Sequence, residues 1–319
     1  MSTALSELSE QQIQAMIHAL DSLSDGELAV TILSACGARV VPYLRHELLE
    51  TSAHAIALPR CRMVKILGEL EAYDVLRQYL QQYRPPKDAI VLFAEDAVHS
   101  AVAHELLRWP TEEVFFLLLE AAQVRASAGI VLALGKFHRD ESTPLLFDLL
   151  EDDLCREEAK QALREIPQAA LGYARLAMAD QASFRRGGAK TLYARRAILE
   201  LLLEFELVAE DWEMLRHLLH SPDPATVIAT AQIGIKIAPQ IEHRSILLSV
   251  LDVCSQLNWL QETDVEGLLD QAPGLAHEIA QESLSQRRAR GEKINWMSPS
   301  WRVLRHVLKE EMTGYSGAI

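Results

Sequence analysis

Apolar residues recur along most of the chain with the spacing of an α-helix. Val40, Val41, Leu44 and Leu48 stand at positions i, i+1, i+4 and i+8, which places them on one side of a helix. The same spacing returns in four later segments, at residues 75–83, 115–119, 145–150 and 215–219. No apolar run alternates with polar residues between hairpin turns. The pattern therefore predicts an all-α protein.

Two short sequences are typical of the start of a helix. Ser9 with Gln12, and Ser24 with Glu27, have the spacing of a capping box. In a capping box the two side chains bond backbone N–H groups that the first helical turn leaves free. We therefore expect helices to begin directly after Ser9 and Ser24.

Glycines that follow apolar stretches recur at a regular distance. Gly37, Gly68 and Gly135 are separated by 31 and 67 residues, which is one and two units of about 33 residues. We expect each to end a helix in the left-handed conformation. A period of 30 to 40 residues built from helix pairs is typical of an α-solenoid, because a single pair cannot bury its own apolar face. The sequence predicts a right-handed α-solenoid of about seven to eight helix pairs.

The organisation expected from this repeat has three parts. Residues 1–22 form an N-terminal capping helix, residues 23–283 the repeat solenoid, and residues 284–319 a C-terminal capping helix and flexible tail. In the last part Trp301, Leu304, Leu308 and Met312 line one side of a helix. The stretch 287–309 is also rich in Arg and Lys, so docking of a partner is an alternative to capping.

One region carries the repeat most clearly. It comprises Val124-Arg-Ala-Ser-Ala-Gly-Ile-Val-Leu-Ala-Leu-Gly135, then Ser142-Thr-Pro-Leu-Leu-Phe-Asp-Leu-Leu150, then Glu151-Asp-Asp-Leu-Cys-Arg-Glu-Glu-Ala-Lys-Gln-Ala-Leu163. These residues resemble the HEAT-like repeats of the phycobilin-lyase type. HEAT-like arrays include scaffolds, adaptors, bilin lyases, a di-iron hydroxylase class and a DNA glycosylase class. The resemblance implies an α-solenoid and leaves the function open.

Charge favours a protein partner over a nucleic acid. The chain has 31 Lys and Arg residues against 45 Asp and Glu, a net charge of −14, which repels a phosphate backbone. The first 170 residues hold 15 of the basic and 26 of the acidic residues, a net charge of −11. We expect this part to attract a protein with a basic surface to a concave face made by the second helix of each pair. The first contacts expected there are exposed side chains at Tyr43, Arg45, His46, Arg77 and Tyr79.

A block without acidic residues lies between Asp180 and Glu200. It contains Arg185, Arg186, Lys190, Arg195 and Arg196. Clustered guanidinium groups bind phosphate and other anions, so this block is a candidate anion site. The alternative is a charged loop and a solvated helix face between repeats. Together with residues 287–309, the block also supports a second alternative, an array that binds nucleic acid.

Neighbouring His and Glu residues raise the question of a metal. The HEAT-like arrays that this chain resembles include deoxyhypusine hydroxylases, which use four such His-Glu pairs to hold two irons. This chain has three, His46-Glu47, His104-Glu105 and His277-Glu278, at spacings that do not match a repeat. We therefore predict no metal and no cofactor. The sequence favours a non-enzymatic scaffold, adaptor or neutralising protein, with a bilin-lyase-like or other small-ligand enzyme as the alternative.

The cysteines and the N-terminal residues bear on location. Cys36, Cys61, Cys155 and Cys254 form no CxxC pair, which is typical of buried thiols in a reducing compartment. The first residues have neither the basic nor the apolar region of a signal peptide. No apolar stretch approaches the roughly 18 residues of a membrane span. We therefore expect a cytoplasmic protein.

Overall fold

The computed structural model describes residues 8–51, 55–179, 189–293, 295 and 297–308, and within these ranges the regular elements are all helices. The predicted all-α class is confirmed. The chain divides into two compact units, Met1–Ala170 and Leu171–Ile319. The boundary lies inside α12 (Pro167–Ala179). The sequence pattern gave no signal for this division and predicted one array over residues 23–283.

The first unit is built from ten α-helices and three short 3₁₀ turns within its described residues. The α-helices are α2 (Glu10–Ala19), α3 (Gly26–Ala35), α4 (Val41–Leu49), α5 (Leu58–Glu69), α6 (Tyr73–Gln82), α7 (Ala89–Leu106), α8 (Glu112–Val124), α9 (Ala128–Lys136), α10 (Thr143–Asp148) and α11 (Arg156–Arg164). The 3₁₀ turns are η1 (Gly37–Val40), η2 (Asp140–Ser142) and η3 (Leu149–Glu151).

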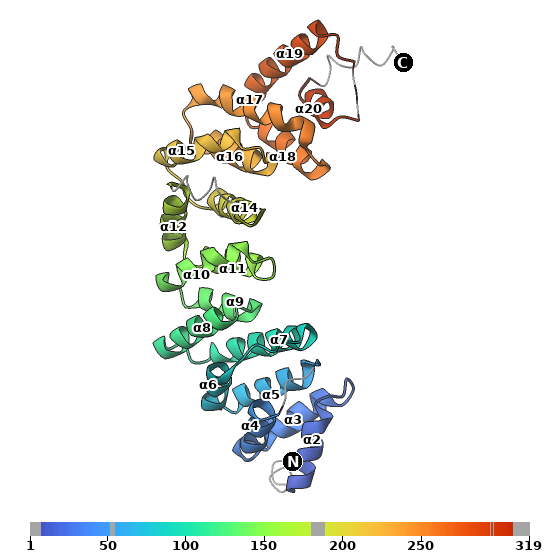
Figure 1. Ribbon diagram of the computed structural model, residues 1–319, viewed down its shortest axis with the longest axis vertical. Helices are drawn as coiled ribbons and strands as arrows, with labels where there is room; N and C mark the ends of the chain where they lie inside the picture. The colour runs from blue at the N-terminus through green and yellow to red at the C-terminus, as the bar shows by residue number, and fades with distance from the viewer. Residues whose placement is uncertain (1–7, 52–54, 180–188, 294, 296, 309–319) are drawn as a thin grey trace. The chain divides into compact units, whose positions relative to one another are not determined.

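These helices form two layers within the first unit. Helices α3, α5, α7, α9 and α11 pack each on the next, and we call them the first-helix layer (Figure 1). Helices α4, α6 and α8 also follow one another, and we call them the second-helix layer. Each second helix is the chain neighbour of the first helix that it covers, so the unit repeats one helix pair.

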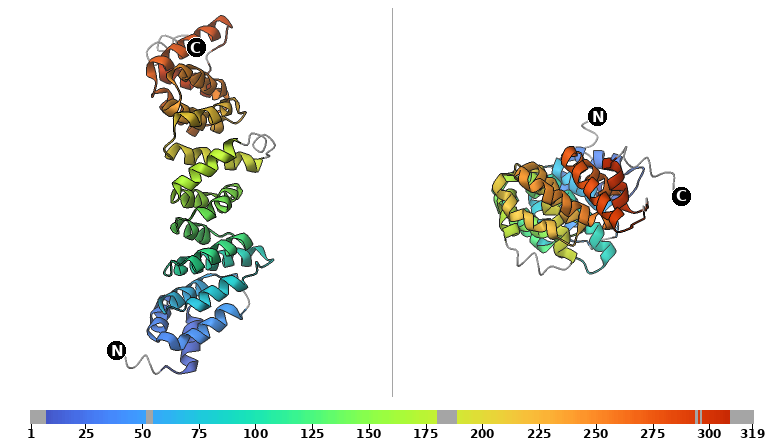
Figure 2. Two further views of the ribbon diagram at one scale, coloured as in Figure 1. Left: turned by 90° about the vertical axis from the view of Figure 1, so that its left-hand side faces the viewer. Right: turned by 90° about the horizontal axis from the view of Figure 1, so that it is seen from above.

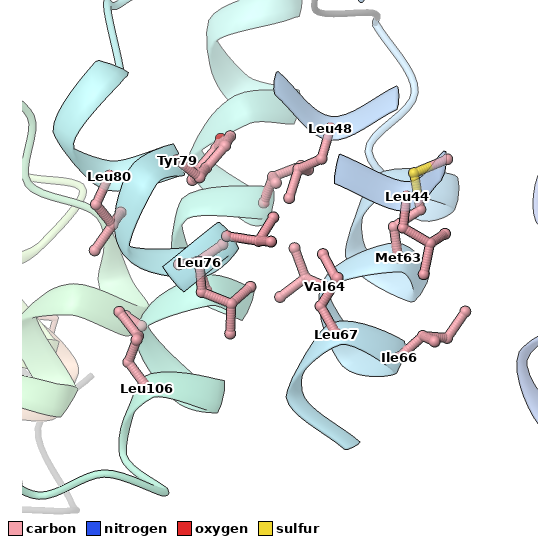
Figure 3. Close-up of a cluster of buried hydrophobic side chains, with 14 of the residues drawn as sticks. Leu44, Leu48, Met63, Val64, Ile66, Leu67, Leu76, Tyr79, Leu80 and Leu106 are labelled. Atoms are coloured by element: carbon pink, nitrogen blue, oxygen red, sulfur yellow. The ribbon is translucent and has the colours of Figure 1, made fainter. Parts of the chain in front are cut away.

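The core lies between the two layers. Stripes at helical spacing, such as Leu44 and Leu48 in α4, Val64 and Leu67 in α5, and Leu76 in α6, meet in one cluster (Figure 3). This cluster continues through the unit from Ile13 to Leu134. Because each helix contacts the pairs before and after its own, burial depends on the stack and not on a single pair.

Glycines let the first helices approach closely. A Cβ atom on Gly68 would lie 2.1 Å from the Glu105 carboxylate of α7, and one on Gly135 would lie 2.7 Å from Ala162 of α11. Each is the second-to-last residue of its helix and has no positive φ, so the expectation that they follow the helix in the left-handed conformation was wrong. The left-handed residues are Glu71 (φ 55°) and His138 (φ 51°), three positions later. Gly37 has φ 65°, as expected.

The closest approach to backbone is at Gly129 of α9. A Cβ atom there would lie 2.5 Å from Ser100 Cα of α7, and the Gly129 N–H donates to Ser100 Oγ at 3.0 Å. We expect Gly129→Ala to lower the free energy of unfolding by about 1–3 kcal/mol, since backbone cannot move aside. Gly267→Ala, in a helix with open space around the glycine, should raise it by about 0.5–1 kcal/mol. Urea denaturation followed by circular dichroism measures both, and equal effects would contradict the packing argument.

The second unit repeats the same kind of packing. Its helices are the greater part of α12, then α14 (Ala189–Glu204), α15 (Ala209–Leu215), α16 (Pro224–Ile237), α17 (His243–Val253), α18 (Trp259–Leu269), α19 (Pro273–Ala289) and α20 (Pro299–Leu308), with the 3₁₀ turns η4 (Arg216–His220), η5 (Gln240–Glu242) and η6 (Cys254–Gln256). Helices α14, α16, α18 and α20 follow one another, and α17 packs on α19. Figure 2 shows the helices of this unit from two further sides.

The last described helix covers apolar residues of the one before it. Trp301, Leu304 and Leu308 of α20 are buried against α19, as the sequence predicted for this stripe. Met312 lies outside the described residues. The expected boundary between residues 283 and 284 falls inside α19.

Candidate functional site

Four of the five predicted contact residues reach the surface. Arg45 and His46 of α4 are exposed, Tyr43 is half-buried, and Arg77 of α6 forms a 2.9 Å ion pair with Glu113. Tyr79 is only 5% exposed, so the expectation that it lies open to a partner was wrong. Its position one turn after Val75 and Leu76 places its ring in the core-facing stripe of α6.

Tyr79 belongs to a polar cluster that lies inside the first unit. We call Arg60, Tyr79, Tyr83, Glu95 and His99 the buried polar cluster. All five are less than 9% exposed. They come from α5, from α6 and the residue after it, and from α7, three successive helices of the chain.

The cluster is organised around one carboxylate. The Arg60 guanidinium pairs with Glu95 and also donates to the Leu48 carbonyl at the end of α4, at 2.9 Å. The Tyr79 hydroxyl donates to the other Glu95 oxygen at 2.8 Å. Burial lowers the pKa of Arg60 and raises the pKa of Tyr79. The guanidinium nevertheless stays charged at neutral pH, because arginine begins from a very high pKa.

His99 occupies the deepest place in the cluster. It has no exposed surface, and its ring centroid lies 4.0 Å from that of Tyr83 and 6.0 Å from that of Tyr79. Neither ring nitrogen has a hydrogen-bond partner in the described part of the chain. Burial lowers its pKa to about 4, against a smaller opposing effect of the Asp96 carboxylate. The imidazole is therefore neutral at pH 7.

Asp96, the residue after Glu95 on α7, forms an ion pair with Arg125 at the end of α8. Arg125 donates to both oxygens of Asp96, at 3.0 and 2.6 Å. The hydrogen bond to Asp96 raises the pKa of Arg125. A two-pronged contact of this kind fixes orientation as well as distance. Asp96 is thereby held in place beside His99.

Ion pairs across about one repeat are a general feature of both units. We call them register pairs. In the first unit they join Glu27 to Arg62, Arg60 to Glu95, Asp96 to Arg125 and Lys136 to Glu165. In the second unit they join Arg175 to Asp211, Arg196 to Asp223, Arg244 to Glu282 and Glu262 to Arg302. Each pair connects helices of neighbouring repeats, or a helix to the residues at its neighbour's end, and so fixes how the repeats stack.

Register pairs account for part of the predicted anion site. Arg196 donates to both carboxylate oxygens of Asp223, which is the N-cap of α16. Its guanidinium therefore already serves a contact between helices. Arg195 is half-buried, and burial lowers its pKa. Arg185 and Arg186, and the side chain of Lys190, lie outside the described residues.

The His-Glu pairs are not brought together into a metal site. His46 contacts Glu50 at 2.9 Å, and Glu105 contacts Arg108 at 2.6 Å. In the ranges that the structure describes, no three His, Cys, Asp or Glu side chains are placed to share a metal ion.

Within the described residues none of the four cysteines forms a disulfide. Cys155 and Cys254 are buried, and Cys36 and Cys61 are half-buried. Burial raises the pKa of the Cys155 thiol to about 11, which keeps it protonated at neutral pH.

A groove of about 390 Å³ opens between α18 and α20 in the second unit. Its lining is charged and consists of Glu262, Glu266, Arg302, Arg305 and His306. One His306 nitrogen lies 3.0 Å from Asp270 Oδ1 and the other lies 3.6 Å from Glu266 Oε2. The basic residues of this segment are thus engaged in part with α18, which fits a cap better than a free basic surface.

Comparison with known proteins adds no relative. No family model matches the chain, and neither a curated protein nor a solved structure matches it. In the described residues no single helix has both the length and the apolar composition to cross a membrane, although the bent pair Gly26–Ala35 and Gly37–Leu49 meets both criteria jointly.

Proposed function

We propose that this chain is a HEAT-like α-solenoid that binds another protein. The observation that carries the proposal is the repeated helix pair of each unit, stacked in layers and fixed by register pairs. A stack of this kind presents a long row of side chains from successive helices, which suits a macromolecule better than a small substrate.

The second-helix layer of the first unit is the proposed contact face. Tyr43 and Arg45 of α4, Asp74 of α6, and Phe116 and Glu120 of α8 are all at least partly exposed. Because this unit carries a net charge of −11, we propose that it steers a partner with a basic surface. In this proposal the second helices line the concave face.

The test is affinity capture with the full chain from its own cells, at about 50 and about 300 mM salt. We expect a basic protein that is retained at the lower salt concentration. A second-helix variant, Tyr43→Ala with Asp74→Asn and Glu120→Gln, should reduce its recovery at least fivefold. A matched first-helix variant, Glu69→Gln with Glu157→Gln, should leave recovery unchanged. Equal recovery with both variants, or recovery that does not depend on salt, would contradict the proposal.

A further inference from the structure

Four large apolar side chains are exposed at the starts of α5 and α7. Ile56 is 57% exposed, Leu58 37%, Ile90 69% and Phe93 76%. We call these four residues the apolar edge. Side chains of this size are normally buried, and several of them together mark a contact surface.

The packing of α5 on α7 places the starts of these two helices side by side. Arg60 pairs with Glu95, and Gly68 contacts Glu105, so the two helices run parallel and in register (Figure 1). Leu58 and Phe93 each precede the residues of that first pair by two positions. Two positions are about 200° of helix rotation, so Leu58 and Phe93 both point away from the buried polar cluster.

Two cations flank the apolar edge. Arg84 and Lys87 are exposed in the segment between α6 and α7. The Arg84 guanidinium donates to the Tyr83 carbonyl at 2.7 Å, and neither residue pairs with a carboxylate of the described chain. The acid next to Lys87 in the sequence, Asp88, caps α7 by accepting from the Ile90 and Val91 N–H groups. Arg125, by contrast, is paired with the Asp96 carboxylate.

We propose that the apolar edge binds an acidic amphipathic segment of a protein partner. Apolar side chains of that segment would cover Ile90 and Phe93, and its carboxylates would pair with Arg84 and Lys87. Although the unit as a whole carries a net charge of −11, a carboxylate placed beside Arg84 and Lys87 interacts most strongly with these two charges, because salt at physiological strength weakens interactions with charges beyond about 8 Å. An anionic bilayer fits less well, since it would bring a broad negative surface against the whole acidic unit.

The inference rests on the proposed function, protein binding, and assigns a second site with a different partner chemistry. The second-helix layer attracts basic surfaces, whereas the apolar edge takes an acidic segment. A scaffold that joins two proteins needs two such sites. The two proposals have separate tests, because the capture variants leave the apolar edge intact.

The probes are two synthetic helical peptides with the same leucine stripe, one with Glu and one with Lys on the polar face. Binding to the full chain is measured by fluorescence anisotropy at about 150 mM salt. We expect the Glu peptide to bind at least fivefold more tightly than the Lys peptide. Ile90→Ser with Phe93→Ser should weaken its binding at least tenfold, and Arg84→Glu with Lys87→Glu at least fivefold.

The matched control removes exposed apolar residues elsewhere in the same unit. Leu23 and Leu154 are 85% and 66% exposed, and Leu23→Ser with Leu154→Ser should leave binding unchanged. Circular dichroism verifies that every variant keeps its helices. The inference is overturned if the Glu peptide does not bind, or if the Lys peptide binds as tightly as the Glu peptide. It is also overturned if the variant with Ile90→Ser and Phe93→Ser binds the Glu peptide as tightly as the wild type. Phe93-dependent binding to anionic vesicles without peptide binding would also overturn it.

Discussion

Replacing Arg60 with Met is expected to lower the free energy of unfolding by about 3–5 kcal/mol. The side chains of Arg60 and Glu95 are 7% and 5% exposed. Without the guanidinium, the Glu95 carboxylate would keep only the Tyr79 hydroxyl as a hydrogen-bond donor. A buried charge that loses its counter-charge costs far more than the pair itself contributes. Urea denaturation of the full chain, followed by circular dichroism, measures the effect.

A matched exposed pair provides the control. Arg77 of α6 pairs with Glu113 of α8, so this pair also joins two neighbouring repeats. The side chains of Arg77 and Glu113 are, however, 40% and 60% exposed. Arg77→Met should therefore cost less than about 1 kcal/mol. The double variant Arg60→Met with Glu95→Leu should recover much of the loss, because no charge is left buried. If Arg60→Met and Arg77→Met cost the same, the buried pair does not hold α5 to α7 as described.

The helices could be predicted because their signals are local. The stripe of Val75, Leu76, Tyr79 and Leu80 indicates a buried helix face, and all four residues are buried. The predicted capping box at Ser9 is present, with Ser9 accepting from the Gln12 N–H and Gln12 reaching back. After Ser24 the prediction was less accurate. Helix α3 begins at Gly26 with Asp25 as its N-cap, and no side chain bonds the free N–H groups.

The buried polar cluster could not be predicted because its signals are not local. Arg60 and Glu95 are 35 residues apart, and only the stacking of one repeat on the next brings them together. The sequence does hold a weak signal, since an Arg and an acid about one repeat apart recur in the register pairs. Tyr79 was expected at the surface, whereas its ring lies in the apolar stripe and its hydroxyl donates to Glu95. The apolar ring of Tyr79 is thus buried together with its polar hydroxyl, which has a hydrogen-bond partner.

The role of a glycine also could not be predicted from local sequence alone. Both a helix-ending glycine and a close-contact glycine follow apolar stretches in the sequence. Gly37 is of the first kind, whereas Gly68 and Gly135 are of the second. What separates them is the neighbour in the next repeat, which for Gly68 is Glu105 and for Gly135 is Ala162. The spacing of these glycines therefore assigned Gly68 and Gly135 the wrong local role.

Acidification is expected to destabilise the first unit through His99. The pKa of His99 is about 4 in the folded chain, against about 6.5 in an unfolded one. Between these values the unfolded chain binds the proton more readily than the folded chain. The contribution of neutral His99 to the free energy of unfolding is therefore fully present above pH 6.5 and is lost as the pH drops toward 4. The two pKa values correspond to a loss of about 3 kcal/mol over this range. Urea denaturation at pH 7, 5.5 and 4.5 measures it.

The variant His99→Phe isolates this contribution from that of the carboxylates. Phenylalanine keeps an aromatic ring against Tyr83 and Tyr79 but has nothing to titrate. Asp96 and Glu95, which adjoin His99 on α7, and Arg60 and Arg125, which face it from α5 and the end of α8, remain in both proteins. The wild type should therefore lose stability relative to the variant as the pH falls from 6.5, and the difference should become constant below about pH 4. If the free energies of unfolding of the two proteins fall in parallel, the His99 ring is hydrated or hydrogen-bonded. The buried polar cluster would then not exclude water as the burial of His99 indicates.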